Sequence, residues 1–397
     1  MQPKQIQTPK VRSTSLLVRL TIGLIGMFAF FQVYSVQSIL PVLMDEFGIS
    51  ELKAGLLVGA TVMGVAVMSP VTGMVSDALG RKRIIALSLM LLAVPTIWMA
   101  YAMDVKTMMI LRFLQGVAIP GITVVTIAYV GEEYQNSSLT KLMVFYVSGT
   151  VMGGFLGRFT LGHLQDWVGW RHALIGMGLV TLLSAAWIAW ALPDSKNFKA
   201  NPNFLSSITV LKSHLKNRYL LSACLLGFCV LFTLVGGFTF INLHLAHAPY
   251  YLSSGQLGNI FAVYLLGVVI TPVTSWLLQR FGTTKTVNIA IAVALGGIVV
   301  TLFQPLWAIV VGLAIMSSGI FISQSATISY IAMNVNKGRS LASGLYYMSY
   351  YIGGSMGAWV CGLIYQLGRW QAVVIALVVV QSLAILIVNQ LMNKHKE

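Results

Sequence analysis

Two arginines lie inside long apolar segments in which no acidic residue accompanies them. Arg112 stands within residues 107–131 and Arg158 within residues 140–165, whereas all ten Asp and Glu residues fall near or beyond segment ends. Arginine keeps its charge at physiological pH, and a charge among apolar residues needs a partner or a polar cavity. Such a cation can hold an anionic ligand or favour ionisation of a nearby carboxyl. The sequence therefore favours a neutral, zwitterionic or anionic ligand over a dication.

A charged turn follows the second apolar segment, in the run Gly-Met-Val-Ser-Asp-Ala-Leu-Gly-Arg-Lys-Arg over residues 73–83. A glycine here can end a helix, and cations suit the negative C-terminal end of a helix. The carboxylate can pair with an arginine or cap a neighbouring helix, and rupture of that pair would release a conformational latch. The predicted latch residues are Gly73, Asp77, Gly80, Arg81, Lys82 and Arg83.

Titratable groups near the ends of the apolar segments are candidates for proton transfer. Among them, histidine is the side chain that ordinarily titrates near neutral pH. A histidine at a segment end also commonly forms an interfacial hydrogen bond, so proton coupling and uncoupled passage both stay open. The candidates for proton coupling are Asp77, Arg112, Glu132, Glu133, His163 and Asp166.

The composition excludes a water-soluble protein. Of 397 residues, 57% are apolar and only 9% are Asp, Glu, Lys or Arg, against about 25% charged residues in soluble domains. Soluble enzymes, nucleic-acid-binding modules and disordered chains are therefore excluded. No catalytic triad pattern, metal-ligand spacing or phosphate-binding loop is visible, so neither an enzyme nor a metal site is expected. The three cysteines lie in apolar runs and are expected to be small buried residues.

Twelve apolar segments are long enough to be membrane-spanning helices, since about 20 residues cross the hydrocarbon core. Their residues do not alternate between polar and apolar types, which argues against the strands of a barrel. The predicted spans are 16–40, 52–76, 84–103, 107–131, 140–165, 171–192, 219–246, 256–279, 285–303, 305–330, 340–366 and 370–391.

An even number of spans places both chain ends on one side of the membrane. On that assignment, 19 of the 25 Lys and Arg residues lie on the side of the termini and four on the other. Arg112 and Arg158 are the remaining two. The positive-inside rule then predicts cytoplasmic termini and explains the net charge of +15. Residues 1–15 carry no signal-peptide pattern and are expected to stay on the chain.

A long polar connection at residues 193–218 divides the spans into six plus six. This predicts an all-α membrane protein of two pseudo-symmetric six-helix bundles. The expected parts are a tail at 1–15, bundles at 16–192 and 219–391 around the cytoplasmic loop 193–218, and a tail at 392–397. Residues of the fifth segment recur in the eleventh at an offset of 200: Tyr146, Gly153, Gly154, Gly157, Gly162 and Trp170 match Tyr346, Gly353, Gly354, Gly357, Gly362 and Trp370.

These motifs resemble those of the major facilitator superfamily. The run 73–83 matches its G-x-x-x-D-x-x-G-R-[RK]-[RK] loop, and residues 275–285 form a degenerate copy without the acid. The sequence Arg112-Phe-Leu-Gln115-Gly116 resembles the R-x-x-Q-G motif of drug:proton antiporters, where the arginine is linked to proton coupling. The alternative for Arg112 is an arginine that snorkels to the outer interface. Residues 149–158 resemble the glycine-rich antiporter motif without its proline, so close helix packing is an equal interpretation.

Residues 37–43, 46–48, 76–82, 148–158 and 346–354 further resemble the YnfM-like branch, which is related to drug and arabinose-efflux permeases. The resemblance implies a bacterial inner-membrane transporter whose helices 1, 4, 7 and 10 line a central cavity, with contributions from 2, 5, 8 and 11. Some tyrosines near span ends are alternatively interface anchors. The substrate-binding candidates are Gln32, Tyr34, Gln37, Arg112, Gln115, Tyr146, Arg158, Asn242, His244, Tyr264, Gln324, Tyr346, Tyr347, Tyr350 and Tyr351.

Two functions stay open. The first is proton-coupled efflux of a small amphipathic drug or metabolite by alternating access. The second is transport of a neutral or anionic organic metabolite, sugar-like or a carboxylate, with Arg112 and Arg158 as binding groups and with or without coupling. A receptor or scaffold is disfavoured because no soluble domain is expected. The expected partners are a small-molecule substrate and the lipid bilayer, without nucleic acid; the protein is expected to be a monomer driven by a proton gradient, with no cofactor.

Overall fold

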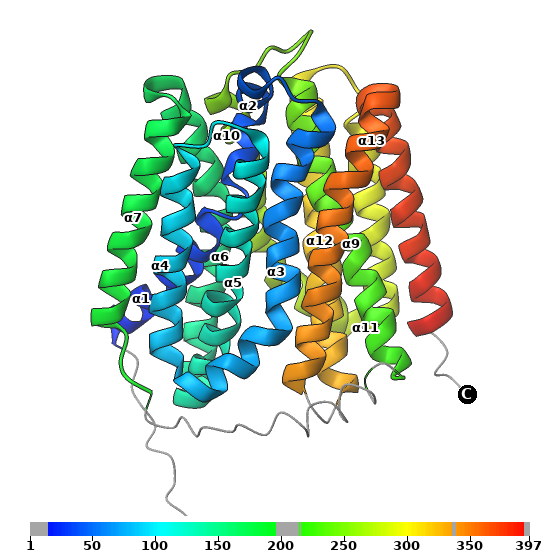
Figure 1. Ribbon diagram of the computed structural model, residues 1–397. Helices are drawn as coiled ribbons and strands as arrows, with labels where there is room; N and C mark the ends of the chain where they lie inside the picture. Colours follow the sequence, from blue (N-terminus) through cyan, green and yellow to red (C-terminus); the bar gives the residue numbers. More distant parts are fainter. Residues whose placement is uncertain (1–14, 196–213, 215, 336–338, 393–397) are drawn as a thin grey trace, which may run out of the picture.

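The computed structural model describes residues 15–195, 214, 216–335 and 339–392, and within these ranges every element is helical. Long helices run side by side and give the molecule the height of a bilayer-spanning bundle (Figure 1). The sequence explains this architecture, since long apolar runs in lipid can satisfy their backbone polar groups only within helices or closed barrels. The predicted all-α polytopic fold is therefore confirmed.

The first part of the chain supplies six spans. They are formed by α1 (Leu16–Phe31) with η1 (Ser35–Ile39) and α2 (Leu40–Phe47), then α3 (Glu51–Leu79), α4 (Arg81–Met99), α5 (Val105–Glu133), α6 (Asn136–Val168) and α7 (Trp170–Ala191).

The second part supplies six more, because two of its helices contain a sharp internal kink. Helix α11 kinks at Gly282, and α13 kinks at Gly368 and Arg369, so each covers parts of two spans. The elements are α9 (Arg218–Leu245), α10 (Ser254–Ile260), η2 (Phe261–Leu265), α11 (Leu266–Val300), α12 (Leu306–Asn334), α13 (Arg339–Ile387) and η3 (Val388–Met392).

The first span departs from the prediction of one continuous helix over residues 16–40. Helix α1 stops at Phe31, and the chain then bends by 43° into the segment Ser35–Phe47. The backbone leaves the helical hydrogen-bond ladder at residues 32–34, and the side chain of Arg112 donates to the carbonyls of Gln32 and Val33 that this frees. A smaller difference is that α11 ends at Val300, three residues before the predicted end of the ninth span.

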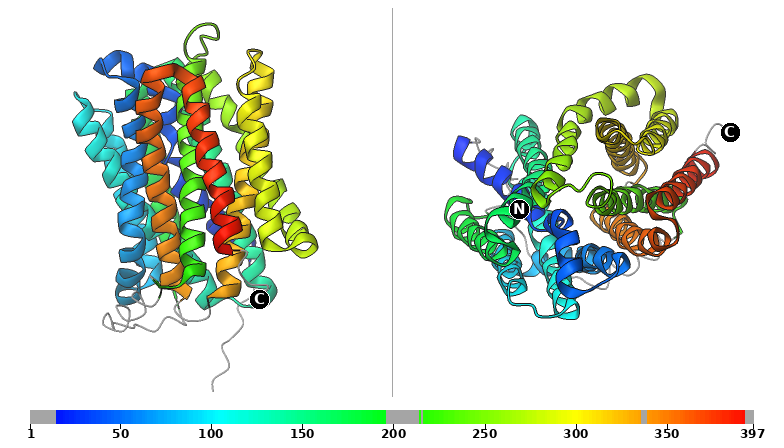
Figure 2. Two further views of the ribbon diagram at one scale, coloured as in Figure 1. Left: turned by 90° about the vertical axis from the view of Figure 1, so that its right-hand side faces the viewer. Right: turned by 90° about the horizontal axis from the view of Figure 1, so that it is seen from above.

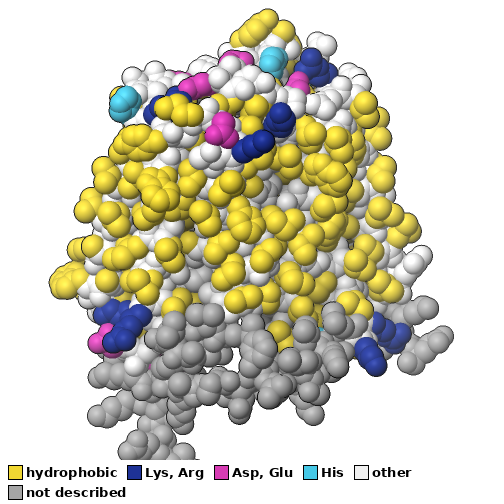
Figure 3. Space-filling view, in the orientation of Figure 1, with side chains coloured by type: hydrophobic (Ala, Val, Ile, Leu, Met, Phe, Trp, Pro, Cys, Tyr) yellow, Lys and Arg dark blue, Asp and Glu magenta, His cyan; other side chains and the backbone are white. Residues whose placement is uncertain are grey.

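The molecular surface matches a lipid environment. Figure 3 shows a broad apolar band between two ends at which charged side chains gather. Large apolar side chains are exposed on several helices, among them Leu91, Leu183, Trp190, Val269 and Ile375. Helix α1 begins, and α13 ends, at the same end of the molecule (Figure 1), which is the end predicted to be cytoplasmic. This end is called the basic end below, and the opposite one the outer end.

The two halves of the chain lie side by side (Figure 2). Two main contacts join them: α6 packs against α10 and η2, and α3 packs against α13. Smaller contacts join η1 to α9 and α10, α3 to α9, and α6 to α11. Both main contacts use glycines for close approach. A Cβ atom on Gly162 of α6 would lie 2.3 Å from the carbonyl oxygen of Ser254, and one on Gly55 of α3 would lie 2.8 Å from that of Ala358.

Candidate functional site

Arg158 lies where α6 meets the C-terminal half, and its side chain is almost completely buried, with 1% of the residue exposed. Its Nε donates a hydrogen bond to Oε1 of Gln37 at 2.7 Å, and its Nη1 donates to the carbonyl oxygen of Gly154. In the part of the chain that the structure describes, no carboxylate forms a salt bridge with it. Arg158 is therefore a buried cation whose charge has only neutral partners.

Three aromatic rings surround the guanidinium of Arg158. Its central carbon lies 4.7 Å from the ring centroid of Tyr34, 4.1 Å from that of Phe261 and 4.7 Å from that of Tyr264. Tyr34 follows α1, whereas Phe261 and Tyr264 belong to η2 in the other half. Aromatic faces attract cations within about 6 Å, most strongly when both are desolvated. The rings thus stabilise the charge without neutralising it.

Gln37 connects Arg158 to the C-terminal half. Its Nε2 donates to Oγ1 of Thr239 at 2.8 Å, and its backbone carbonyl accepts a hydrogen bond of 3.1 Å from Nδ2 of Asn242. All of these side chains are buried. Among the described residues, Oδ1 of Asn242 has no hydrogen-bond partner. This group of polar side chains therefore contains one buried acceptor, Oδ1 of Asn242, that no described donor satisfies.

A tyrosine cluster lies on the basic-end side of Arg158. It consists of Tyr346, Tyr347, Tyr350 and Tyr351 of α13, whose neighbouring rings have centroids 5.3 to 6.3 Å apart. Tyr34 and Tyr146 of the N-terminal half lie within electrostatic range of Tyr351. Tyr146 precedes Arg158 by about three turns of α6. The cluster thus belongs to the C-terminal half and lies near Tyr34, whose ring covers Arg158.

Arg112 occupies a different place and is fully buried within the N-terminal half. Its guanidinium donates to the backbone carbonyls of Leu57 (3.1 Å), Gln32 (2.9 Å) and Val33, and to Oε1 of Gln115 at 2.7 Å. Four of its five N–H groups are thus engaged. Arg112 satisfies the carbonyls freed by the break in the first span, and the interfacial snorkelling alternative is wrong for it.

Gln32 and Gln115 complete this internal network rather than joining Arg158. Nε2 of Gln32 donates to Oγ1 of Thr181 at 3.0 Å, and Nε2 of Gln115 donates to Oγ1 of Thr96 at 2.7 Å. Three of the predicted binding residues are therefore occupied in holding helices of one bundle together.

The predicted latch lies at the basic end. Arg81 donates from Nη2 to Oε1 of Glu132 at 2.6 Å and from Nε to Oε2 at 3.1 Å, and it also reaches Oγ of Ser76. Lys82 pairs with Asp194 at 3.0 Å. Arg83 is exposed, Glu133 is buried, and Gly80 has a φ of 91°. The side chain of Asp77 and the surroundings of Gly73 lie outside the described part of the structure.

The other proton-coupling candidates join the halves at the outer end. Nε2 of His163 lies 3.0 Å from Oδ1 of Asn259. Oδ2 of Asp166 accepts hydrogen bonds from Oγ of Ser253 at 2.8 Å and from the backbone N–H of Gly255 at 2.9 Å. These groups join α6 to both ends of α10, and neither of them bonds to Arg158 among the interactions of the described residues.

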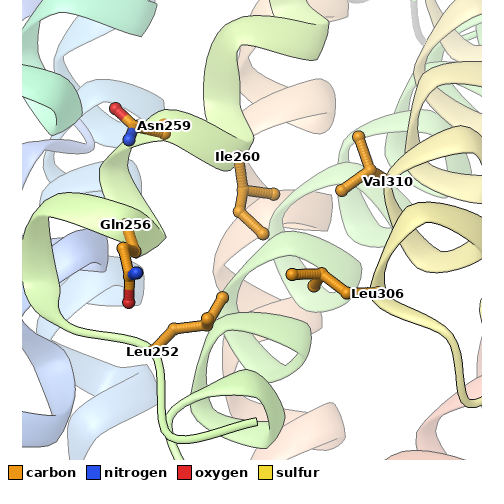
Figure 4. A pocket seen from close by; sticks show the side chains of 6 residues that line it. All are labelled: Leu252, Gln256, Asn259, Ile260, Leu306 and Val310. Carbon is orange, nitrogen blue, oxygen red and sulfur yellow. The ribbon is translucent and has the colours of Figure 1, made fainter.

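Two predicted binding residues lie apart from the cluster. His244 is at the outer end of α9, where its ring packs against Tyr250 and Trp370. Gln324 is half-buried on α12. A pocket of about 240 Å³ opens near the outer end between α10 and α12, lined by Leu252, Gln256, Asn259, Ile260, Leu306 and Val310 (Figure 4). None of the predicted binding residues lines it.

Two residues near Arg158 were not among the predicted binding residues. Phe261 covers its guanidinium, and Thr239 binds Gln37. Nothing distinguishes Phe261 from the other 17 phenylalanines in the sequence. A signal did exist for the helix that carries it, because Ser253 and Gln256 form a capping box at the start of α10. The predicted eighth span, 256–279, already contained Phe261, and recognition of that box would have moved its start to residue 254.

Comparison with known proteins agrees with this architecture. The family model described as Major Facilitator Superfamily matches residues 22–252 and 238–392. An uncharacterized transporter of Buchnera aphidicola subsp. Schizaphis graminum is 30% identical, over 93% of this chain and 89% of its own. The inner membrane transport protein YnfM of Escherichia coli (strain K12) is 30% identical, over 94% and 91%.

More distant relatives have names that mention a compound. The chloramphenicol resistance protein CraA of Acinetobacter baumannii is 24% identical over 86% of this chain and 84% of its own, and a gallate transporter of Pseudomonas putida is 28% identical over 45% and 39%. Among solved structures, a bacterial homologue of the human lysosomal transporter Spinster, in an inward-facing and occupied conformation, superposes with a TM-score of 0.76 at 16% identity, over 95% of this chain and 96% of that one. This last likeness concerns the fold alone.

Proposed function

The chain belongs to the Major Facilitator Superfamily and is a multi-pass membrane transporter, and we propose that its cargo is a small organic anion held by Arg158. The observation that carries the proposal is a buried guanidinium, 1% exposed, whose described partners are all neutral. An ion inside a membrane protein is costly, and such residues usually serve a transport pathway. An anion would supply the charge that this cation lacks.

The surrounding side chains favour an anion that carries an aromatic or similarly flat apolar group. Tyr34, Phe261 and Tyr264 cover the guanidinium, and the tyrosine cluster of α13 begins next to them. A carboxylate at Arg158 would place its apolar part among these rings, where stacked and edge-to-face contacts are favourable. The relative named as a gallate transporter, which covers less than half of this chain, supports the same cargo class.

Alternating access would expose this site to each side in turn. The two halves meet on both sides of Arg158, and a rocking motion of one bundle against the other would open one end while closing the other. The hydrogen bonds of His163 and Asp166 would hold the outer end closed. The pair of Arg81 with Glu132 would stabilise the helices of the basic end.

The second candidate function is proton-coupled efflux of an amphipathic drug. The relative CraA and the R-x-x-Q-G motif at Arg112 favour it. Proton transfer would then involve Asp77, Glu132, Glu133, His163 or Asp166. Arg112 would contribute by positioning the first span, since its N–H groups already bind protein carbonyls.

The experiment is a transport assay with purified protein in lipid vesicles under an imposed pH gradient. Benzoate and other aromatic acids are compared with their amides and with cationic drugs. We expect the acids to be carried, and Arg158→Gln to reduce their transport by about tenfold to a hundredfold, the value of a lost charged hydrogen bond. Arg171→Gln, at an exposed pair with Glu46, is the matched control. Transport of cations or amides in preference to acids would contradict the proposal.

A further inference from the structure

Gln37 joins the proposed cargo site to the opposite half of the molecule. It accepts from Arg158 at 2.7 Å, donates to Thr239 at 2.8 Å, and accepts through its backbone from Asn242 at 3.1 Å. We infer that the cargo anion and the Gln37 amide compete for the guanidinium of Arg158, so that binding of cargo releases the outer ends of the two halves from one another. This inference rests on the proposed function and specifies how the site controls the gate.

The competition follows from the geometry of the guanidinium. Gln37 takes the Nε–H of Arg158, and Nη1 is engaged by Gly154. A carboxylate that binds arginine through two parallel hydrogen bonds at its side-on edge uses Nε together with Nη2. The bond from Arg158 to Gln37 is already strengthened by the charge of the guanidinium, but a carboxylate adds an opposite charge and a second parallel hydrogen bond. A carboxylate arriving at this edge therefore displaces Oε1 of Gln37.

Displacement weakens the closed outer end because it takes the Arg158 donor away from the buried Oε1 of Gln37. Asn242 is fully buried and its Oδ1 already has no partner among the described residues. A displaced Oε1 of Gln37 would be a second buried acceptor without a donor, which is unfavourable until water enters. Separation of η1 from α9 admits that water.

Other contacts at the outer end do not depend on Arg158. His163 and Asp166 bind α10 and its N-terminal flank through groups that are half-buried or exposed. Water can replace these partners at little cost, whereas the links made by Gln37 are buried. Gln37 is thus the positioning residue through which occupancy of Arg158 is communicated to the gate.

The first measurement is made without cargo. Spin labels are placed at Asp45→Cys on α2 and Leu367→Cys on α13, both exposed, after replacement of Cys224, Cys229 and Cys361 by alanine. Gln37→Met should raise the population with separated outer ends by about fivefold, as expected for one lost buried hydrogen bond. Gln381→Met is the matched control, because Gln381 donates to Thr233 at 2.7 Å within one half. An unchanged distance distribution in Gln37→Met overturns the inference.

The second measurement is the affinity for benzoate. Gln37→Glu supplies a permanent carboxylate to Arg158 and should weaken benzoate binding by at least about tenfold, whereas Gln37→Met removes the competitor and should leave binding equal or tighter. Equal weakening in both variants overturns competition. Should Gln37→Met fail to fold, Thr239→Val removes the hydrogen bond from Gln37 to the other half and serves in its place in the distance measurement. Failure of the wild-type protein to bind any aromatic acid overturns the proposed cargo, while the distance measurement still decides whether Gln37 holds the outer end.

Discussion

The N-terminal and C-terminal halves share one packing plan but differ in buried charge. A Cβ atom on Gly157 would lie 2.0 Å from the carbonyl oxygen of Phe31, and one on Gly357 would lie 2.4 Å from that of Phe232. In both halves, therefore, the fifth helix approaches the first at the same glycine of the repeat. The next position is Arg158 in one half and Ala358 in the other.

The contacts between the halves repeat this relation. The carbonyl oxygen of Arg158 lies 2.8 Å from the Cβ position of Gly258, and the carbonyl oxygen of Ala358 lies 2.8 Å from that of Gly55. The same kind of backbone contact thus occurs at both interfaces, once beside an arginine and once beside an alanine. This backbone contact between the halves does not require the cation, which agrees with the binding role proposed for Arg158.

The first helices of the two halves differ in a second way. Helix α1 stops at Phe31, whereas its counterpart α9 runs unbroken from Arg218 to Leu245. Arg112 supplies N–H donors to the carbonyls at the break. The two buried arginines therefore differ in their partners. Arg112 stabilises the irregular backbone of the first span, whereas Arg158 has neutral partners only and no acidic side chain in a salt bridge with it among the described residues.

The largest effect should come from placing an arginine at the equivalent position of the other half. Ala358→Arg introduces a charge at a fully buried site beside Gly55 and Gly59. A buried unpaired ion costs several kcal/mol, so we expect almost no folded protein in detergent, measured by size-exclusion chromatography. Ala358→Met adds bulk without charge and should retain more. Equal yields of Ala358→Arg and Ala358→Met would contradict the prediction, because they would show that the C-terminal half tolerates a buried arginine at this position.

A smaller loss of stability should follow replacement of Arg112, whose guanidinium binds the broken first span. Arg112→Met removes the Arg112 donor from the carbonyl of Val33 and from Oε1 of Gln115, at about 1–3 kcal/mol for each unsatisfied buried group. The carbonyls of Gln32 and Leu57 lose one donor each, and Oγ of Ser35 still donates to that of Gln32. The melting temperature of the purified protein should fall markedly, whereas Arg158→Met, which frees one amide and one carbonyl, should lower it less. A reversed order of the two melting temperatures would assign the structural role to Arg158 instead.

Sequence reasoning reached the fold because length and hydropathy alone specify membrane helices, and the repeat at an offset of 200 specified two related halves. It also selected Tyr34, Gln37, Arg158 and Tyr264, which the structure brings together. It could not find the break at residues 32–34, because these residues lie within a long apolar segment and the carbonyls of Gln32 and Val33 are bound by Arg112, some 80 positions away in the chain. For the same reason it assigned a binding role to Arg112, since a backbone partner leaves no pattern in side-chain types.

The smallest effects on stability should come from polar contacts at the outer ends of the two interfaces, the one between α6 and α10 and the one between α3 and α13. Asp166 accepts two hydrogen bonds from the start of α10, so Asp166→Ala should destabilise the closed outer end by about 1 kcal/mol, as for loss of a helix cap. Arg369 pairs with Glu51 at 3.1 Å, but its side chain is 69% exposed, so Arg369→Gln should change stability by less than about 0.5 kcal/mol. Distances between spin labels on the two halves report both changes. An Arg369→Gln effect as large as that of Asp166→Ala would show that the interface between α3 and α13 also depends on charge, and the contrast between the two interfaces would then rest on Arg158 alone.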